Sequence, residues 1–162
     1  NNYGNLCQRI SAFVLKNCKG KIPNEIKFEA DDLLILNKYK DNLQKIRLNI
    51  DEQNINFYID YIVNSLFEAN KYFNDQEPWK KKDDPLRLNT IVYTTLEIVR
   101  KISVLLYPII PDSSLKALKI FNITEKELNL SSISNHEILS KGNEINKINI
   151  LFKKIEKEVI ND

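Results

Sequence analysis

The chain has 162 residues, of which 43% are hydrophobic and 28% charged, as expected for one ordinary globular domain. Its 3 glycines and 5 prolines are too few for the many turns of a β-sandwich or a β-barrel. The 24 basic and 22 acidic residues leave a net charge of +2, so the overall charge does not indicate nucleic-acid binding. Any basic surface must come from local arrangement.

The spacing of the cysteines and the hydropathy of the chain indicate in which cellular compartment the protein is located. Cys7 and Cys18 fall in one expected helix, roughly 16 Å apart along its axis, which is too far for a disulfide. No Cys-x-x-Cys pair or His-rich cluster occurs, so we expect no metal site. Reduced cysteines, without a signal peptide or a long apolar run, favour a cytoplasmic protein with no membrane contact. Because it begins at Asn1 inside a helix, we interpret 1–162 as one domain excised from a longer chain.

Hydrophobic periodicity predicts three helices in the first half of the chain. The first covers 1–18 and ends before Gly20 and Pro23; its apolar side carries Leu6, Ile10, Phe13, Val14 and Cys18. The second covers 30–48, with these residues inward: Leu33, Leu36, Tyr39, Leu43 and Ile46. The third covers 52–73, is expected to be capped by Asp51, and should bury Ile55, Ile59, Ile62, Val63, Leu66 and Phe73.

The second half begins with the most strongly periodic stretch. Asp84 as N-cap and Pro85 in the first turn predict a fourth helix over 85–107. A short helix near 112–120 follows, and Thr124 with Glu127 matches a capping box for one or two more turns. Residues 131–147 are expected to be polar and irregular, and 151–160 to form a final amphipathic stretch. The predicted fold class is all-α, a helical bundle of four main helices plus short C-terminal helices.

Catalytic chemistry finds little support in the sequence. His136 is the single histidine, and we expect it to be a solvated loop residue rather than a general base. The pairs Asp31-Asp32 and Asp83-Asp84 stand at expected helix starts, where the helix dipole already favours carboxylates. No Gly-rich phosphate loop, Gly-x-Ser-x-Gly or His-Glu-x-x-His motif occurs. We therefore assign no catalytic residue to this chain.

The segment around Trp79, the one tryptophan, has the composition of a nucleic-acid contact. It follows Pro78 and precedes Lys80, Lys81 and Lys82. A flat ring at a proline-fixed turn can stack on a base, while the lysines attract phosphate. From this segment alone, a Trp79 that plugs the end of the helix bundle is equally compatible.

A polar stripe on the first helix supports the nucleic-acid interpretation. Asn5 and Arg9 are one turn apart on the same face, which also carries Asn2 and Lys16. Asn offers a donor and an acceptor and Arg a planar fork of donors, groups that read the edges of unpaired RNA bases. The Asn-x-x-x-Arg spacing is common on surface helices and has little weight alone.

Five segments of the chain resemble, in the same order, the motifs of one known family. The opening Gly4-Asn5-Leu6-Cys7-Gln8-Arg9 resembles the family's Gly-Asn-Leu-x-x-Arg motif. Asn70-Lys71-Tyr72-Phe73 with Glu77-Pro78-Trp79 is similar to its Asn-x-Tyr…Pro-Trp segment. Leu96-Glu97-Ile98-Val99-Arg100 is similar to the family's next helix, and Leu105-Leu106-Tyr107-Pro108-Ile109-Ile110-Pro111 to the proline-bounded turn after it. Leu151-Phe152-Lys153-Lys154-Ile155-Glu156 resembles its ending, although lysines replace the family's proline and arginine. Together these segments make the chain resemble the anticodon-binding domain of the methionyl-tRNA synthetase family.

The resemblance implies a function and its residues. The family's bundle reads the CAU anticodon of methionine tRNA, elongator and initiator. Its tryptophan stacks on an anticodon base, which maps to Trp79, and its asparagine and arginine bond anticodon bases, which map to Asn5 and Arg9. Pro78, Asn2 and Lys80 are expected to support them. We expect the three principal residues to be solvent-accessible on one side of the bundle.

The resemblance also implies what lies outside this chain. Methionine activation belongs to an upstream Rossmann-type catalytic domain that uses ATP with magnesium, with zinc as a further candidate cofactor. We expect no cofactor in residues 1–162. Because the chain stops soon after the Leu-Phe motif, we expect no C-terminal dimerising domain and a monomeric enzyme.

Two alternatives stay open from the sequence. The first is the related helical domain of another class I synthetase, for an amino acid such as cysteine, leucine or valine. The second is a helical protein-interaction module with Trp79 as its anchor. Salt dependence would separate this second alternative from RNA binding, since phosphate contacts weaken steeply with added salt.

Overall fold

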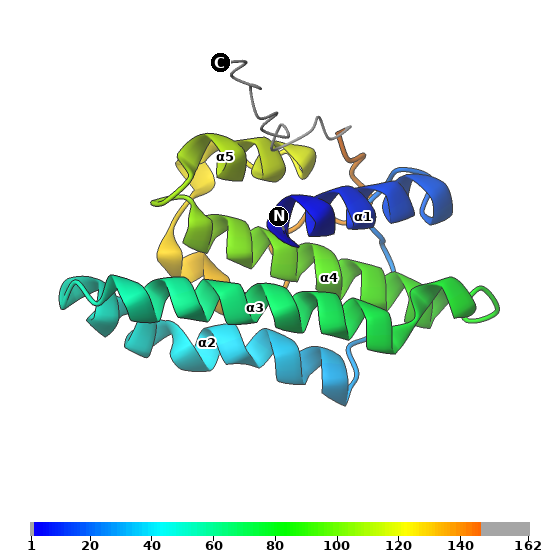
Figure 1. Cartoon of the computed structure of the whole chain (residues 1–162). Coiled ribbons are helices and arrows are strands. Elements are labelled where there is room, and N and C mark those ends of the chain that lie inside the picture. Colours follow the sequence, from blue (N-terminus) through cyan, green and yellow to red (C-terminus); the bar gives the residue numbers. More distant parts are fainter. Residues whose placement is uncertain (1, 147–162) are drawn as a thin grey trace, which may run out of the picture.

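A computed structural model describes residues 2–146, whose helices pack around a central one, α4 (Figure 1). The α-helices are α1 (Asn2–Asn17), α2 (Ala30–Asp51), α3 (Ile55–Gln76), α4 (Pro85–Leu106) and α5 (Pro111–Ile120). Three 3-10 turns accompany them, η1 (Pro78–Lys80), η2 (Glu125–Glu127) and η3 (Leu130–Ser134). The predicted all-α bundle is confirmed, and the expected stretch 151–160 lies outside the described residues.

Helix α4 forms the centre of the bundle. Figure 1 shows α2 and α3 on one side of it and α1 and α5 on the other. Every residue from Thr90 to Leu106 is buried, as expected for a helix that is apolar on most of its circumference. The predicted start is confirmed, because the Asp84 carboxylate accepts a hydrogen bond from the Arg87 backbone N–H at 3.0 Å and Pro85 occupies the first turn.

Helix α2 is longer than predicted, and its first turn buries a different residue. It runs through Asp51, which therefore does not cap α3; the cap is Asn54, whose side chain accepts from Phe57 N–H at 3.3 Å. Leu33 was predicted to point inward but is 38% exposed, while its neighbour Asp32 is fully buried. The inward positions Leu36, Tyr39 and Ile46 are confirmed, with Leu43 half-buried. A buried ion pair of Asp32, described below, accounts for its burial in place of Leu33.

Helix α3 has apolar residues around most of its circumference. The stripe of residues that the sequence predicted to be buried is therefore only partly correct. Ile62, Leu66 and Phe73 are buried as expected, but Ile55, Ile59 and Val63 are 55%, 41% and 42% exposed. The face that packs inward also carries small and hydroxyl-bearing residues, which hydropathy does not mark: Tyr58, Ser65, Ala69 and Tyr72. Tyr58 donates its hydroxyl to the Leu105 carbonyl, which satisfies that buried group.

The C-terminal part follows the prediction in its local elements but not in its burial. Helix α5 is confirmed, and Thr124 and Glu127 form the predicted capping box around η2. Residues 131–146 contain no α-helix, yet Ile133, Leu139 and Ile145 are buried in the core. This segment therefore packs against the bundle and contributes to its core, instead of forming a polar loop outside it.

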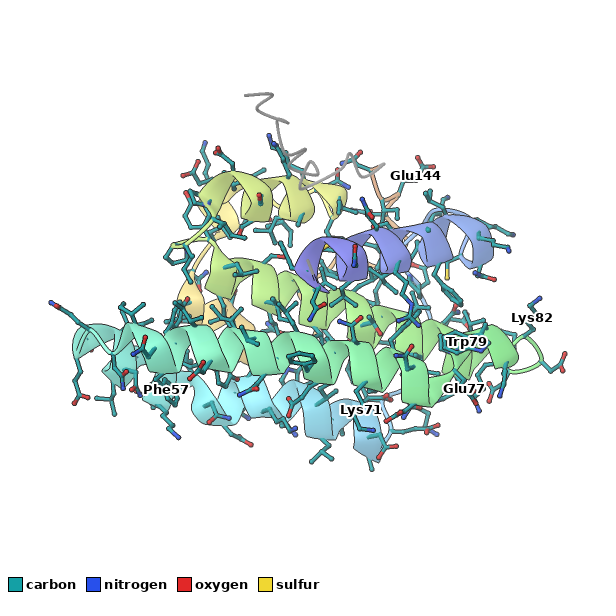
Figure 2. All side chains as sticks on the ribbon, viewed as in Figure 1. Phe57, Lys71, Glu77, Trp79, Lys82 and Glu144 are labelled. Atoms are coloured by element: carbon teal, nitrogen blue, oxygen red, sulfur yellow. The ribbon has the colours of Figure 1, made fainter. Side chains whose placement is uncertain are left out.

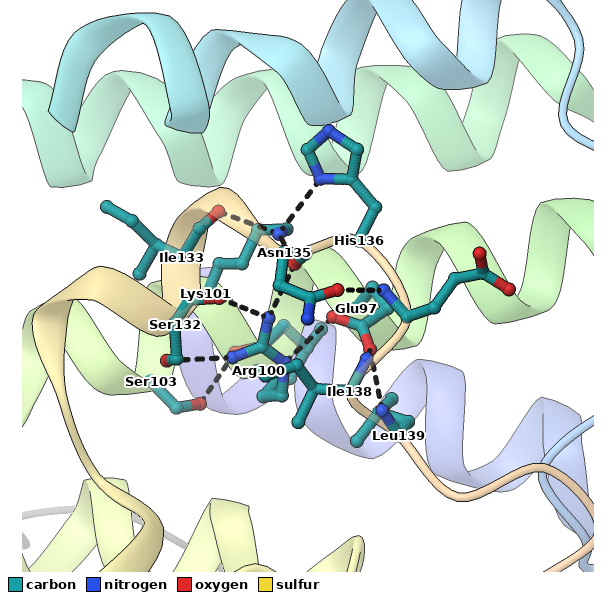
Figure 3. A network of polar contacts seen from close by, with 12 residues as sticks. Glu97, Arg100, Lys101, Ser103, Ser132, Ile133, Asn135, His136, Ile138 and Leu139 are labelled. Carbon is teal, nitrogen blue, oxygen red and sulfur yellow. Dashed lines mark hydrogen bonds and ion pairs between the residues drawn. The ribbon is translucent and has the colours of Figure 1, made fainter.

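A buried polar network on α4 fixes the segment 132–139 (Figure 3). The Glu97 carboxylate accepts from the backbone N–H groups of Ile138 and Leu139, both at 2.7 Å. Arg100 donates to the carbonyls of Ser132 and Asn135, each at 3.0 Å, and pairs with Glu97 at 2.8 Å. Side chains of α4 thus bond backbone groups at the end of η3 and in the segment that follows it.

His136 belongs to the same network, so the expectation of a solvated loop histidine was wrong. The ring is half-buried; Nδ1 lies 3.2 Å from Lys101 Nζ and Nε2 lies 2.9 Å from Asn37 Oδ1. Burial, followed by the nearby Lys101 charge, lowers the pKa of His136. Its contacts join the segment 132–139 to α4 and α2.

Candidate nucleic-acid interface

The turn that carries Trp79 joins α3 to α4. Helix α3 ends at Gln76, and Glu77 adopts a left-handed conformation with φ 44° that reverses the chain into η1. Pro78 is buried and fixes the first η1 position, whereas Trp79 is 40% exposed. Figure 2 shows Trp79, Glu77 and Lys82 at one end of the bundle, with Phe57 toward the other end of α3.

Arg9 of α1 reaches the same corner as Trp79. Its guanidinium carbon lies 4.8 Å from the Phe73 ring centroid and 5.8 Å from that of Trp79. Its Nη2 donates to Asn74 Oδ1 at 2.5 Å. The Phe73 and Trp79 rings pack edge to face, with their centroids 6.0 Å apart and an angle of 66° between the ring planes. Trp79 is therefore neither a core plug nor a free side chain: one part packs and the rest faces solvent.

The other predicted residues of α1 lie on the exposed side of this helix. Asn5 and Asn2 are exposed, one and two turns before the half-buried Arg9. The structure thus brings Arg9 and Trp79 together, with Asn5 next along α1. Residues Asn2–Asn17 include Arg9 and Lys16 but no carboxylate, so α1 offers an anion no intrinsic repulsion.

The three lysines after Trp79 are not equivalent. Lys80 forms an ion pair with Glu77 at 2.7 Å, which offsets part of its charge. Among residues 2–146, no ion pair forms at Lys81, which is half-buried, or at Lys82, which is exposed. Lys82 is the more available cation for a phosphate, and Lys80, predicted as a supporting residue, is the least available.

A buried charge cluster holds the base of the Trp79 turn, and the sequence reading missed it. Arg87 Nη1 and Nη2 donate to Asp32 at 2.6 and 3.0 Å, and Nη2 also donates to Gln76 Oε1 at 2.6 Å. Tyr72 donates its hydroxyl to Asp32 as well. The cluster ties the start of α2, the end of α3 and the start of α4 together, so both ends of the turn are anchored. The one signal was the scarcity of arginine in a lysine-rich chain.

The grooves and free thiols of the described residues lie apart from the Arg9–Trp79 corner. A groove of about 390 Å³ lies between α2 and α3, but its lining includes neither Arg9 nor Trp79. Over residues 2–146, no group of three or more His, Cys, Asp or Glu side chains could hold a metal ion. Cys7 and Cys18 are free thiols. The described helices include none long and apolar enough to cross a membrane.

The helical bundle and its aromatic–arginine corner define an all-α domain of the anticodon-binding type. The family model described as the anticodon binding domain of methionyl tRNA ligase matches residues 22–162. The chain therefore belongs to the anticodon-binding domain family of methionyl-tRNA ligase. Asn5 and Arg9 precede the matched range.

Individual relatives agree with this family. The methionine–tRNA ligase of Brucella suis is 37% identical over 76% of the chain and 24% of its own length. That of Rickettsia felis is 33% identical over 99% of the chain and 32% of its own length. The chain thus spans a quarter to a third of these relatives.

Solved structures agree as well. The apo form of the Mycobacterium tuberculosis methionyl-tRNA synthetase superposes with a TM-score of 0.87 at 28% identity, over 98% of this chain and 32% of that one. The same enzyme bound by methionyl-adenylate gives a TM-score of 0.85 at 29% identity, over 94% of this chain and 31% of that one.

Proposed function

We propose that this domain reads the CAU anticodon of methionine tRNA, elongator and initiator, within a methionine–tRNA ligase. The observation that carries the proposal is the contact between Arg9 and Trp79, which come from distant parts of the chain. A partly exposed indole beside a guanidinium combines a stacking face with a fork of donors, the two groups that unpaired bases require.

The roles of the remaining residues follow from their places. Trp79 stacks on one anticodon base, and Arg9 and Asn5 bond base edges, chiefly of the first anticodon position. Pro78 holds the η1 turn, Asn2 extends the polar face of α1, and Lys80 adds a partly offset charge.

The activity of the whole protein is part of the same proposal. We propose that an upstream catalytic domain activates methionine with ATP and magnesium in the cytoplasm, and transfers it to the tRNA selected here. The methionyl-adenylate bound by the Mycobacterium tuberculosis relative supports this chemistry. Zinc in that domain and a monomeric state stay predictions.

The proposal is tested by anticodon selectivity in the full-length protein. RNA hairpins with CAU, UAU and GAU loops are titrated against the wild type, Arg9→Ala and, as control, Lys16→Ala on the same helix. We expect the wild type to bind the CAU hairpin about 5- to 150-fold more tightly than the other two. This ratio corresponds to about 1–3 kcal/mol of discrimination at one base. Arg9→Ala should lose most of this preference, and Lys16→Ala should keep it. Equal affinity of the wild type for all three hairpins would refute the proposal.

A further inference from the structure

A stripe of exposed apolar side chains runs along α3. Ile59, Val63 and Phe67 follow one another at four-residue spacing and are 41%, 42% and 58% exposed. Scattered exposed apolar residues are ordinary, but neighbours along one helix face form a continuous patch. None of these three residues takes part in the site proposed above.

The stripe leads toward the corner formed by Arg9 and Trp79. Positions 67, 70 and 74 share one face of α3 by helical spacing. The Asn74 side chain on this face accepts a hydrogen bond from Arg9, so this side of α3 borders α1. Phe67 precedes Asn74 by seven residues, about 10 Å along the axis. This distance is about the height of three stacked bases in one nucleic-acid strand.

The charged side chains between Phe67 and the Arg9–Trp79 corner are paired with one another, so this surface has no net negative charge that would repel a polyanion. Helix α1 carries no carboxylate, and Asn70 and Asn74 are neutral amides. Of the nearby carboxylates, Glu68 pairs with Lys38 at 2.7 Å and Asp75 pairs with Lys71. Asp60, seven residues before Phe67 and farther from the corner, is exposed and has no ion-pair partner within the described part of the chain.

We propose that Phe67 is a second stacking platform, which takes an unpaired nucleotide of the same RNA loop whose anticodon base stacks on Trp79. Its ring is the largest exposed apolar group of the stripe, and a base stacks on phenylalanine whatever its sequence. Val63 extends the apolar contact to the sugar edge. This inference rests on the proposed function, since it adds to the same RNA loop.

The test uses the full-length protein and a CAU-loop RNA hairpin. Phe67→Ala is compared with Phe67→Trp, with Trp79→Ala and with Ile55→Ala, a matched control that is 55% exposed at the far end of α3. We expect Phe67→Ala to weaken binding about 5- to 30-fold, the equivalent of 1–2 kcal/mol for one stacked base. Phe67→Trp should restore binding, and Ile55→Ala should leave it unchanged.

The outcomes separate this inference from the proposed function. If Trp79→Ala weakens binding and Phe67→Ala does not, Phe67 is no platform but the proposed function stands. If neither variant weakens binding, both are refuted. Sedimentation velocity then compares the oligomeric state of the wild type with that of Phe67→Ala. If the wild type is a dimer, the variant is a monomer and their hairpin affinities are equal, the stripe is a self-association surface and the inference is overturned.

Discussion

Arg87 and Asp32 form a two-pronged ion pair between α4 and α2, with N···O distances of 2.6 and 3.0 Å. Asp32 is fully buried and Arg87 is 9% exposed. A bidentate guanidinium–carboxylate pair fixes distance and orientation together. Because Arg87 also bonds Gln76, the last residue of α3, the pair sets the position of the turn that carries Trp79.

Removal of one partner should therefore destabilise the domain strongly. Asp32→Ala leaves the Arg87 charge buried without its carboxylate, and we expect a loss of about 3–5 kcal/mol in the free energy of unfolding. Urea denaturation measures it. Asp31→Ala, the exposed neighbour on α2, is the control and should cost well under 1 kcal/mol. Equal effects of the two variants would show that the pair does not anchor the turn.

Loss of Glu97 should release the segment it holds. Its carboxylate satisfies two backbone N–H groups and pairs with Arg100. We expect Glu97→Ala to speed amide hydrogen exchange at Ile138 and Leu139 far more than in α2, and to destabilise the domain by about 3–5 kcal/mol. Unchanged protection at these two amides would contradict the role given to the network.

Stability should depend on pH through Lys101. Its Nζ donates to the Ile133 and Asn135 carbonyls, and burial, followed by the Arg100 charge, lowers the pKa of Lys101 to about 7. In the unfolded chain the group keeps its proton up to about pH 10.4. Above pH 7 the unfolded state thus binds more protons, so this group makes stability rise with pH, by up to about 1.4 kcal/mol per unit.

The measurement compares wild type and Lys101→Met by urea denaturation between about pH 7 and pH 8.5. The upper limit is set by Cys7, because burial raises the pKa of its thiol to about 12, which has the opposite effect at higher pH. We expect the unfolding free energy of the wild type to rise with pH relative to that of Lys101→Met. A constant difference, or a Lys101 side chain that titrates near pH 10 by NMR, would contradict the lowered pKa.

Salt dependence should distinguish the lysines beside Trp79. Each phosphate contact with single-stranded RNA contributes about 0.7 to the slope of log affinity against log salt. Lys82→Ala should reduce the slope by about that amount, and Lys80→Ala by less, since Glu77 already pairs with Lys80. Hairpin titrations at several salt concentrations measure the slopes. A wild-type affinity independent of salt would favour an aromatic-anchored protein interface instead.

The helices could be predicted from sequence because their apolar period and caps are local signals, as Asp84 with Pro85 and Thr124 with Glu127 show. The residue that α2 buries in its first turn could not be predicted in this way. Leu33 is the more apolar residue, but the buried position goes to Asp32, whose partner Arg87 is 55 residues away. The buried Ile133 and Leu139 were missed for a similar reason, since α4 side chains bond the backbone around them.

The residues of the candidate site could be predicted from the sequence, but their arrangement in space could not. Asn5, Arg9 and Trp79 could be named from a family resemblance. Their arrangement depends on Phe73 and Asn74, which bring the α1 guanidinium to the η1 indole. In the sequence, Phe73 reads only as a core residue and Asn74 only as part of a polar connection. No spacing rule joins them to Arg9.

The most direct test of the account is Trp79→Ala, measured for stability and for RNA binding in the same protein. Because Trp79 is 40% exposed and packs edge to face on Phe73, we expect a stability loss of about 0.5–1.5 kcal/mol. Affinity for methionine tRNA should fall about 5- to 150-fold, the equivalent of 1–3 kcal/mol per stacked base. In the full-length protein, methionine activation by ATP should stay largely intact. A variant that loses about 3–5 kcal/mol of stability yet still selects the CAU anticodon would make Trp79 a core residue and contradict the account.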